Sequence, residues 1–301
     1  MNSYQGWLNV YKPTGISSFG VVKQIKRKFR LNKVGHGGTL DPLAEGVLPI
    51  AIGKTTKLIS FINSDIKEYE FEIKWGEQTS TDDTEGEIID RSDYIPHRDS
   101  INNKIKEFNG EILQKPPKAS AVKINGKRAY KLLREKKEFS INPKKVFIFS
   151  SEILDASNKF VTKIKIKCGK GFYVRSFARD LAENLHTKGH IKTLKRTKVG
   201  SFSYKNSNLL DDLLKIGQTL TEFKGFHTSV SMLDDILAYE IVDEKDLLSV
   251  SQGKSIKIDI KKLNPLLNSA DRKIIFLTAN EEVISFGKLN GDLFKPDKVL
   301  I

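Results

Sequence analysis

The sequence predicts an α+β fold built from two domains, and three observations lead to this prediction. The chain has 301 residues, enough to bury a substantial core in one large or two modest domains. Residues 1–230 interleave segments of alternating apolar and polar residues with segments of helical spacing, as expected for a sheet flanked by helices. Residues 231–301 consist of short strand-like segments separated by turns, which predicts a small β-rich domain.

The first elements are expected to be a strand, a turn and a helix. Residues 6–11 are strand-like, and Lys12-Pro13-Thr14-Gly15 is typical of a turn. Ser17 or Ser18 is a candidate N-cap for a helix with apolar residues at near-helical spacing. These apolar residues are Phe19, Val22, Ile25 and Phe29.

The next part of the chain alternates between irregular segments and strands. Residues 35–42 are too rich in Gly and Pro for a regular element, whereas residues 47–52 form an apolar, strand-like run. Residues 68–75 alternate strictly, which predicts a half-buried strand. Its apolar side would carry Tyr69, Phe71, Ile73 and Trp75. A polar loop is expected at residues 79–86.

The remaining elements of residues 1–230 include a basic hairpin and two further helices. A helix carrying Ile101, Ile105 and Phe108 is expected to stop at Gly110. Residues 114–137 are basic, with an Asn125-Gly126 hairpin turn and a helix at 128–136. Residues 159–168 alternate, and a helix with one apolar stripe follows Gly171. The inward face of that strand would carry Phe160, Ile164, Ile166 and Cys168.

The last seventy residues predict a small all-β unit, with a boundary near residues 228–232. Turns such as Asn290-Gly291 link its candidate strands. These strands are expected at 238–242, 255–260, 273–279, 282–288 and 292–299.

Composition excludes several classes of protein. No stretch approaches the roughly 20 apolar residues of a membrane span, and residues 1–7 lack the basic and apolar regions of a secretion signal. The single cysteine, Cys168, rules out an internal disulfide and a Cys-rich metal site. A cytoplasmic location without membrane association is therefore expected.

The net charge of +14 and the pI near 9.5 point to a polyanionic partner such as a nucleic acid. A compositional bias is an equal alternative, because lysine is spread along the whole chain beside abundant Ile and Asn. Charge alone leaves the two explanations open.

Asp41 lies in a segment that presents its side chain to the surroundings. Pro42 disfavours the helical conformation for Asp41, and nearby glycines allow a sharp turn and close approach of another molecule. Local chemistry alone favours a plain turn, because Asp-Pro and glycine pairs are common in loops.

Five motifs follow one another over nearly all of residues 6–200. They are Lys12-Pro13-Thr14-Gly15-Ile16-Ser17-Ser18, Gly35 to Pro49 followed by Gly53-Lys54-Thr55-Thr56-Lys57, Tyr69 with Gly76 and Thr79 to Asp83, Lys115-Pro116-Pro117 with Ser120-Ala121, Lys123, Gly126 and Tyr130, and Gly169 to Ser176. In residues, order and spacing these motifs resemble those of the TruB family of tRNA pseudouridine synthases, and the C-terminal part resembles the family's PUA-like tail more weakly.

The resemblance implies a fold and an activity. The catalytic domain, residues 1–230, would be built on a mixed, mainly antiparallel sheet flanked by helices, with an RNA-gripping insertion at about 112–140. Residues 231–301 would form the PUA-like β domain. The activity would be isomerisation of uridine to pseudouridine at position 55 in the T-arm of tRNA. That reaction breaks the C1′–N1 bond and rejoins the base through C5, and it needs no cofactor.

The resemblance also implies catalytic roles for Asp41, Tyr69 and Arg175. Asp41 would attack the sugar or take a C2′ proton on the way to a glycal. Arg175 would keep it ionised, since an Arg within a few ångströms typically lowers an Asp pKa by about 1–3 units. Tyr69 would stack on the flipped uracil, with its hydroxyl available for the C5 proton.

Six further residues match substrate-binding positions of the family. His36 would fill the space left by the flipped nucleotide, and Lys12 and Pro13 would shape the pocket floor. Tyr173 and Leu194 would line the uridine pocket, although both fit a core position equally well. The set is His36, Tyr173, Leu194, Lys12, Pro13 and Asp83. For Asp83 an ordinary loop role is an equal alternative.

Other classes of function are weighed against this one. No metal site is expected, because no His/Asp/Glu cluster has ligand spacing. A glycosidase is disfavoured because Asp82 and Asp83 are sequence neighbours without a supporting frame. A non-catalytic tRNA-folding chaperone and a guide-RNA-dependent relative remain alternatives. The expected partner is the tRNA T-arm stem-loop without guide RNA, bound by a monomer.

Overall fold

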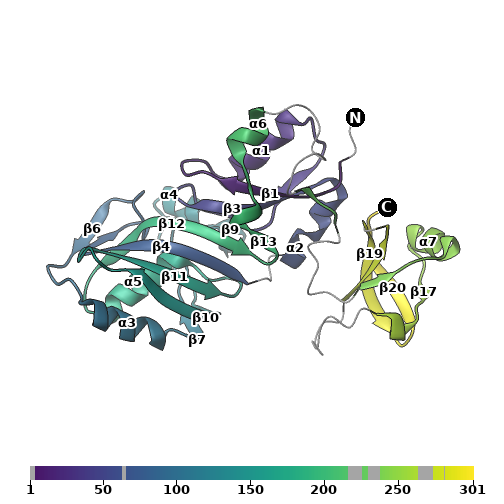
Figure 1. Cartoon of the computed structure of the whole chain (residues 1–301). Coiled ribbons are helices and arrows are strands. Elements are labelled where there is room, and N and C mark those ends of the chain that lie inside the picture. The colour runs from purple at the N-terminus through teal and green to yellow at the C-terminus, as the bar shows by residue number, and fades with distance from the viewer. Residues whose placement is uncertain (1–3, 63–65, 216–225, 230–237, 264–273, 281) are drawn as a thin grey trace.

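The computed structural model describes residues 4–62, 66–215, 226–229, 238–263, 274–280 and 282–301. Within these ranges the chain forms an eleven-stranded mixed sheet and, near the C-terminus, a five-stranded sheet, each with helices beside it (Figure 1). The predicted α+β class is confirmed. Among the described helices, none has the length and apolar character that a membrane span requires.

The large sheet is mainly antiparallel, as expected. Its strands are β1 (Gly6–Lys12), β2 (Val34–His36), β3 (Glu45–Ile52), β4 (Lys67–Trp75), β7 (Gly110–Gln114), β10 (Lys144–Asp155), β11 (Val161–Cys168), β12 (Gly189–Val199), β13 (Phe202–Ser203), β14 (Asn208–Leu209) and β15 (Phe226–His227). The order is β14-β1-β3-β12-β4-β11-β10-β7, with β2, β13 and β15 paired to β3, β12 and β1. In the register of β12, Arg196 lies between Gly46 of β3 and Tyr69 of β4.

Helices and short 3-10 turns cover this framework. The helices are α1 (Ser18–Lys28), α2 (Ile59–Ile62), α3 (Arg98–Glu107), α4 (Ala129–Arg134), α5 (Val174–Asn184), α6 (Leu210–Lys215) and α7 (Glu244–Ser251), and the 3-10 turns are η1 (Gly53–Leu58), η2 (Tyr204–Asn206) and η3 (Ile260–Lys262). The hydroxyl of Ser17 accepts a hydrogen bond from Gly20 N, which confirms the predicted N-cap of α1.

β4 and α5 build the core beneath the site. Every second side chain of β4 is buried, which confirms the predicted alternation. The buried side chains of β4 pack on the apolar stripe of α5, where the rings of Phe71 and Phe177 meet edge to face at 5.9 Å. This packing fixes the first turn of α5 relative to Tyr69 of β4.

Two aromatic side chains that the sequence pattern predicts to be buried are exposed in the structure. Phe19 is 71% exposed, because the buried stripe of α1 is centred on Ser18, Val21 and Ile25. At 3.6 residues per turn, Phe19 points roughly a third of a turn away from that stripe. Phe160 is also exposed, because β11 begins only at Val161 and Phe160 belongs to the preceding turn.

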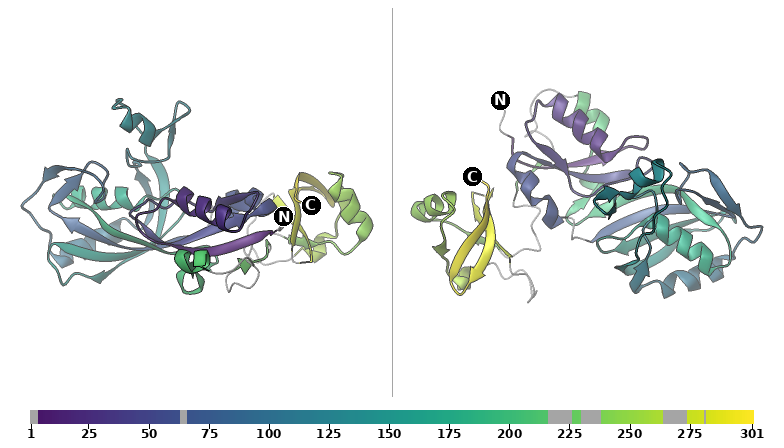
Figure 2. Two further views of the ribbon diagram at one scale, coloured as in Figure 1. Left: turned by 90° about the horizontal axis from the view of Figure 1, so that it is seen from above. Right: turned by 180° about the vertical axis from the view of Figure 1, so that it is seen from behind.

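Residues 115–137, called the arm below, leave the sheet between β7 and β10. They contain α4 and a hairpin of β8 (Lys123–Ile124) and β9 (Lys127–Arg128), turned by Asn125 and Gly126 with φ angles of 47° and 82°. The predicted hairpin is confirmed. Figure 2 shows the arm projecting from the large sheet on the same side that α5 covers. A further two-stranded sheet pairs β5 (Glu77–Thr79) with β6 (Ile88–Arg91).

The C-terminal sheet has the order β16-β18-β19-β20-β17. Its strands are β16 (Ala238–Glu240), β17 (Ile256–Lys257), β18 (Ile274–Ala279), β19 (Glu282–Asn290) and β20 (Leu293–Val299). The expected small β-rich unit is confirmed, but it is not all-β, because α7 packs Val250 into the core of this sheet. Asp243 caps α7 by accepting a hydrogen bond from Lys245 N. The predicted boundary near 228–232 falls partly on residues 230–237, which lie outside the described residues.

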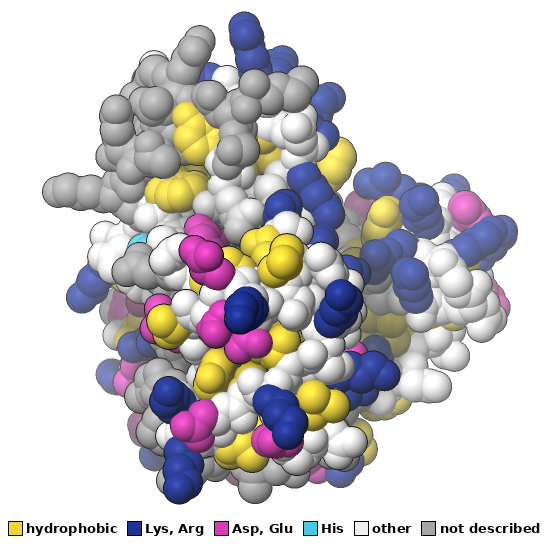
Figure 3. Space-filling model, turned by 90° about the vertical axis from the view of Figure 1, so that its right-hand side faces the viewer, with side chains coloured by type: hydrophobic (Ala, Val, Ile, Leu, Met, Phe, Trp, Pro, Cys, Tyr) yellow, Lys and Arg dark blue, Asp and Glu magenta, His cyan; other side chains and the backbone are white. Residues whose placement is uncertain are grey.

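The two sheets share an apolar cluster. Trp7 and Val47 of the large sheet lie in one cluster with Phe276 and Val283 of the C-terminal sheet. Between the sheets, the ring of Phe61 meets the rings of Phe276 and Phe286 at 4.9 Å each. The surface on this side of the molecule carries acidic and basic side chains intermixed (Figure 3).

Candidate active site

A pocket of about 380 Å³ opens on the α5 side of the large sheet. This volume suits a small organic ligand of nucleoside size. Its walls come from the loop between β2 and β3, from β4 and β12, from the base of the arm, and from the turn that leads into α5. Six of the nine predicted site residues line it, namely Asp41, Tyr69, Arg175, His36, Tyr173 and Leu194.

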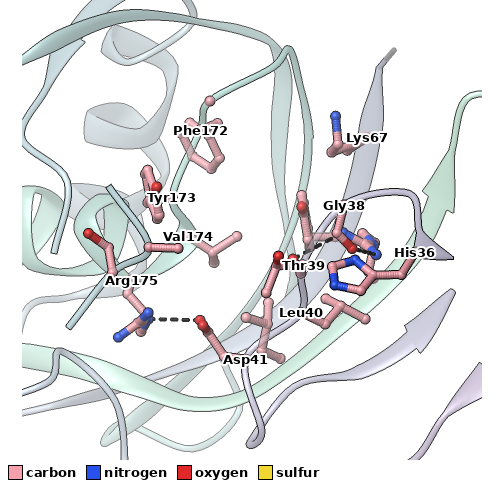
Figure 4. A pocket seen from close by; sticks show the side chains of 16 residues that line it. His36, Gly38, Thr39, Leu40, Asp41, Lys67, Phe172, Tyr173, Val174 and Arg175 are labelled. Atoms are coloured by element: carbon pink, nitrogen blue, oxygen red, sulfur yellow. Dashed lines mark hydrogen bonds and ion pairs between the residues drawn. The ribbon is translucent and has the colours of Figure 1, made fainter. Parts of the chain in front are cut away.

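The structure brings Asp41 and Arg175 together on one wall of this pocket. Arg175 Nε lies 2.9 Å from Asp41 Oδ2, and Figure 4 shows the two side chains pointing toward each other. The Arg175 side chain is 5% exposed, whereas that of Asp41 is 33% exposed. The guanidinium is therefore held inside the protein while the carboxylate remains accessible from the pocket.

Arg175 makes three further contacts that fix its orientation. Its Nη1 lies 3.4 Å from Asp83 Oδ2 and donates to the Thr81 carbonyl at 3.0 Å. Its Nη2 donates to the Ala119 carbonyl, at the base of the arm, at 3.0 Å. One guanidinium thus joins Asp41, the loop that follows β5, and the arm.

The pKa of Asp41 lies above the ordinary aspartate value, although Arg175 lowers it as expected. Burial is the largest cause, and the neighbouring charge of Asp83 adds to it, while Arg175 and Lys12 act in the opposite direction. Removal from water therefore outweighs the ion pair for this carboxyl group. Arg175 limits the increase rather than reversing it.

Asp82 and Asp83 have a supporting frame that their sequence did not reveal. Asp83 Oδ1 accepts hydrogen bonds from Thr81 Oγ1 at 2.5 Å and from Glu85 N at 3.0 Å. Asp82 pairs with Arg179 at 3.0 Å, and burial raises its pKa to about 6. Asp83 is buried behind Arg175 and does not line the pocket, so it acts on the pocket through Arg175.

Lys12 and Pro13 also lie outside the pocket wall. The Lys12 ammonium is buried and donates to the carbonyls of Pro13, Ile16 and Pro42 at 2.8, 2.7 and 3.2 Å. Burial lowers its pKa to about 8. Because one of these acceptors directly follows Asp41, Lys12 holds the Asp41 loop from behind.

Tyr69, Tyr173 and His36 present rings to the pocket. Burial raises the pKa of Tyr69 to about 12, so its hydroxyl is protonated near neutral pH. Tyr173 is fixed at the start of α5 because its backbone N donates to Gln114 Oε1 at 2.8 Å, and Gln114 Nε2 donates back to its carbonyl at 3.1 Å. Burial and the charge of Arg196 lower the pKa of His36, which favours the neutral imidazole.

Arg196 and Lys67 line the pocket and were missed by the sequence analysis. Arg196 is 1% exposed. Gly46 of β3 pairs with Arg196 in the sheet and has a φ of +109°. A Cβ at position 46 would lie 2.2 Å from the Arg196 carbonyl oxygen, so the close approach of β3 to β12 requires glycine there. Lys195 and Lys198 flank Arg196, and the sequence alone does not show that Arg196 is the buried one of these three cations.

Within the described ranges, no group of three or more His, Cys, Asp or Glu side chains is arranged to hold a metal ion.

Residues 26–174 match the family model described as TruB family pseudouridylate synthase (N terminal domain). The chain is 50% identical over 216 residues to tRNA pseudouridine synthase B of Wolbachia pipientis subsp. Culex pipiens, covering 71% of this chain and 61% of that protein. It is 37% identical to tRNA pseudouridine synthase B of Caulobacter vibrioides, covering 96% of this chain and 95% of that protein.

A solved structure shows the same fold. The match is a chain of a Cbf5-Nop10-Gar1 complex, with a TM-score of 0.75 and 24% identity, covering 98% of this chain and 85% of that one. The family model and the length over which the relatives align leave one assignment: the chain belongs to the TruB family of pseudouridylate synthases.

Proposed function

We propose that this protein isomerises uridine to pseudouridine at position 55 in the T-arm of tRNA, with Asp41 as the reacting carboxylate. One observation carries the proposal: an accessible carboxylate, paired with a buried guanidinium, faces a nucleoside-sized pocket that a tyrosine ring lines. The names of the Wolbachia and Caulobacter relatives support tRNA as the substrate.

The pocket residues divide the chemistry between them. Asp41 attacks C1′ or takes a C2′ proton as the C1′–N1 bond breaks, and either route needs an ionised oxygen beside the sugar. Arg175 orients this oxygen and favours its charged form. Tyr69 stacks on the flipped base, the usual way in which proteins hold an unstacked RNA base. His36, Tyr173 and Leu194 complete the wall around the nucleoside.

The arm is the proposed grip on the tRNA. It carries nine Lys or Arg residues and a single Glu, and its base meets the pocket at Ser120 and Ala121. Because the C-terminal side of the molecule mixes both signs of charge (Figure 3), the arm is the stronger candidate for phosphate contacts. Such contacts offset the cost of extracting the base, roughly a few kcal/mol.

The direct test is pseudouridine mapping on a T-arm stem-loop treated with the purified chain alone. Conversion at the position equivalent to 55, without guide RNA, metal or cofactor, is the expected result. Conversion only with an added guide RNA, or at another uridine of full-length tRNA, would replace this proposal. A protein that binds and refolds tRNA without converting any uridine would be a chaperone instead.

Charge reversal in the arm tests the grip. Lys118→Glu combined with Lys123→Glu is expected to weaken tRNA binding about 10- to 100-fold near physiological salt, and to reduce the slope of log K against log [salt] by about 2. Both side chains are exposed, so the melting temperature should not change. The matched control is Lys106→Glu with Lys245→Glu, two exposed lysines outside the arm. Equal losses in the two double variants would reject the arm as the grip.

The raised pKa of Asp41 predicts where activity falls at low pH. Only the ionised carboxylate attacks or accepts a proton, and the ionised fraction falls as the pH drops through the raised pKa. The acid limb of the single-turnover rate, at saturating RNA, is therefore expected clearly above the ordinary aspartate value of 3.8. RNA affinity measured over the same pH range separates chemistry from binding. An acid limb at or below 3.8 would contradict the prediction.

A further inference from the structure

Arg196 is a buried cation whose described partners are all uncharged. Its Nε donates to the Val47 carbonyl at 2.9 Å, and its Nη2 donates to the Gly38 carbonyl at 3.0 Å. A third, longer contact of 3.5 Å joins Nη1 to the Thr39 carbonyl. None of the ion pairs formed by the described residues includes Arg196, although its side chain is among the largest that are fully buried.

A buried charge without a counter-charge is costly, so proteins rarely keep one without a function. The neighbours of Arg196 increase this cost, because its charge contributes to lowering the pKa values of Lys12 and His36. The negative charge of Asp41 is already paired with Arg175. This part of the site is therefore prepared for a negative charge that the chain itself does not supply.

Arg196 lines the pocket that would hold the target nucleoside. Arg196 lines the same pocket as Asp41 and stands opposite Tyr69 in the register of β12 and β4. Its charge also opposes the effect of burial on the pKa of the Tyr69 hydroxyl. Its charge thus reaches the pocket directly and through the Tyr69 hydroxyl.

The proposed reaction creates a negative charge at this place. When the C1′–N1 bond breaks, its electron pair stays on uracil, which becomes an anion with charge spread over N1 and the two carbonyl oxygens. C1′ gains either a new bond to an Asp41 oxygen or a double bond to C2′, which forms when Asp41 removes the proton from C2′. The C5=C6 electrons then form the new bond to C1′ as the N1 electrons shift toward C6, while the Asp41 oxygen leaves C1′ or the C2′ proton returns from Asp41. Loss of the C5 proton and protonation of N1 restore the neutral base. The base is thus anionic only between the two bonds.

We infer that Arg196 is a catalytic residue that stabilises the detached uracil anion, while Arg175 serves the carboxylate on the opposite side of the sugar. This inference rests on the proposed function. A fixed cation aimed at a charge that appears only during the reaction lowers the barrier without tightening substrate binding. Loss of Arg196 should therefore reduce the rate constant more than the affinity.

The test varies the cation and the leaving group together. Arg196→Gln, Arg196→Lys and the control Lys198→Gln, an exposed residue of the same strand, are compared under single-turnover conditions. One T-arm RNA carries uridine at the target and a second carries 5-fluorouridine. Fluorine makes the ring nitrogen more acidic, so the fluorinated anion needs less help from the protein. Digestion and mass spectrometry follow the loss of the N-linked nucleoside in each RNA.

We expect Arg196→Gln to lower the rate on uridine about 10²-fold, with a several-fold smaller loss on 5-fluorouridine and RNA affinity within about threefold. Arg196→Lys should recover part of the loss, and Lys198→Gln should match the unmodified protein. Equal losses on the two RNAs would mean that Arg196 only supports the Gly38 loop, and a loss of affinity alone would assign its charge to a phosphate. Both results overturn the inference. If the unmodified protein converts no uridine, the proposed function itself fails.

Discussion

Replacement of Asp41 by Asn is expected to abolish pseudouridine formation, lowering the single-turnover rate by about 10⁴-fold or more. The amide fills the same space, but it neither attacks C1′ nor accepts a C2′ proton. Arg175 keeps Asp83 and two carbonyl acceptors in this variant, so the fold should survive. Tritium release from C5-labelled uridine and filter binding would measure activity and affinity on the same preparation.

The control for this variant is Asp211→Asn, an exposed carboxylate on α6. It should retain both activities. Affinity for tRNA should stay within about threefold in Asp41→Asn, because a neutral replacement in the pocket leaves the phosphate contacts intact. If Asp41→Asn continues to isomerise uridine, the chemistry proposed for this carboxylate is wrong.

Arg175→Gln is expected to have the second largest effect, and it acts on both rate and stability. The rate should fall about 10²- to 10³-fold, because Asp41 loses its orienting partner. The pKa of Asp41 should increase further, since Arg175 opposes the effect of burial, and the acid limb should move to higher pH. Leaving Asp83 buried without its cation should cost about 3–5 kcal/mol of unfolding free energy, measured with denaturant.

Arg179→Gln is the matched control for Arg175→Gln. Arg179 lies one turn further along α5 and pairs with Asp82, but it has no contact with Asp41 among those described. It should reduce stability while leaving the acid limb in place. Equal shifts of the acid limb in both variants would show that α5 as a whole, rather than the guanidinium of Arg175, controls Asp41.

Sequence patterns predict secondary structure well where a single hydrophobic periodicity runs through the whole element. β4 alternates over its whole length because one face packs on α5 while the other meets water, and the Asn125-Gly126 turn has the φ angles that its residues favour. The prediction of buried residues fails where burial depends on the strands or helices that pack against an element. Phe19 has helical spacing, yet the centre of the buried stripe of α1 is set by the strands below it. α7 was missed because strand signals surround it.

The candidate site was only partly visible in the sequence. Local chemistry favoured a plain turn for Asp41, and the family motifs alone singled it out. No pattern could show that Lys12 holds the Asp41 loop from behind or that Arg196 is buried, because contacts between distant strands determine both. The direction of the Asp41 pKa depends on the depth of burial, which is a property of the folded chain.

The root of the arm has a mechanical consequence. Arg175 donates to the Ala119 carbonyl, and the hydroxyl of the next residue, Ser176, donates to the Lys115 carbonyl at 2.7 Å. The arm therefore cannot pivot at its root without pulling on the helical turn that aims the guanidinium at the carboxylate. Insertions or deletions at this root would alter the speed of the reaction even where every lysine that holds RNA is kept.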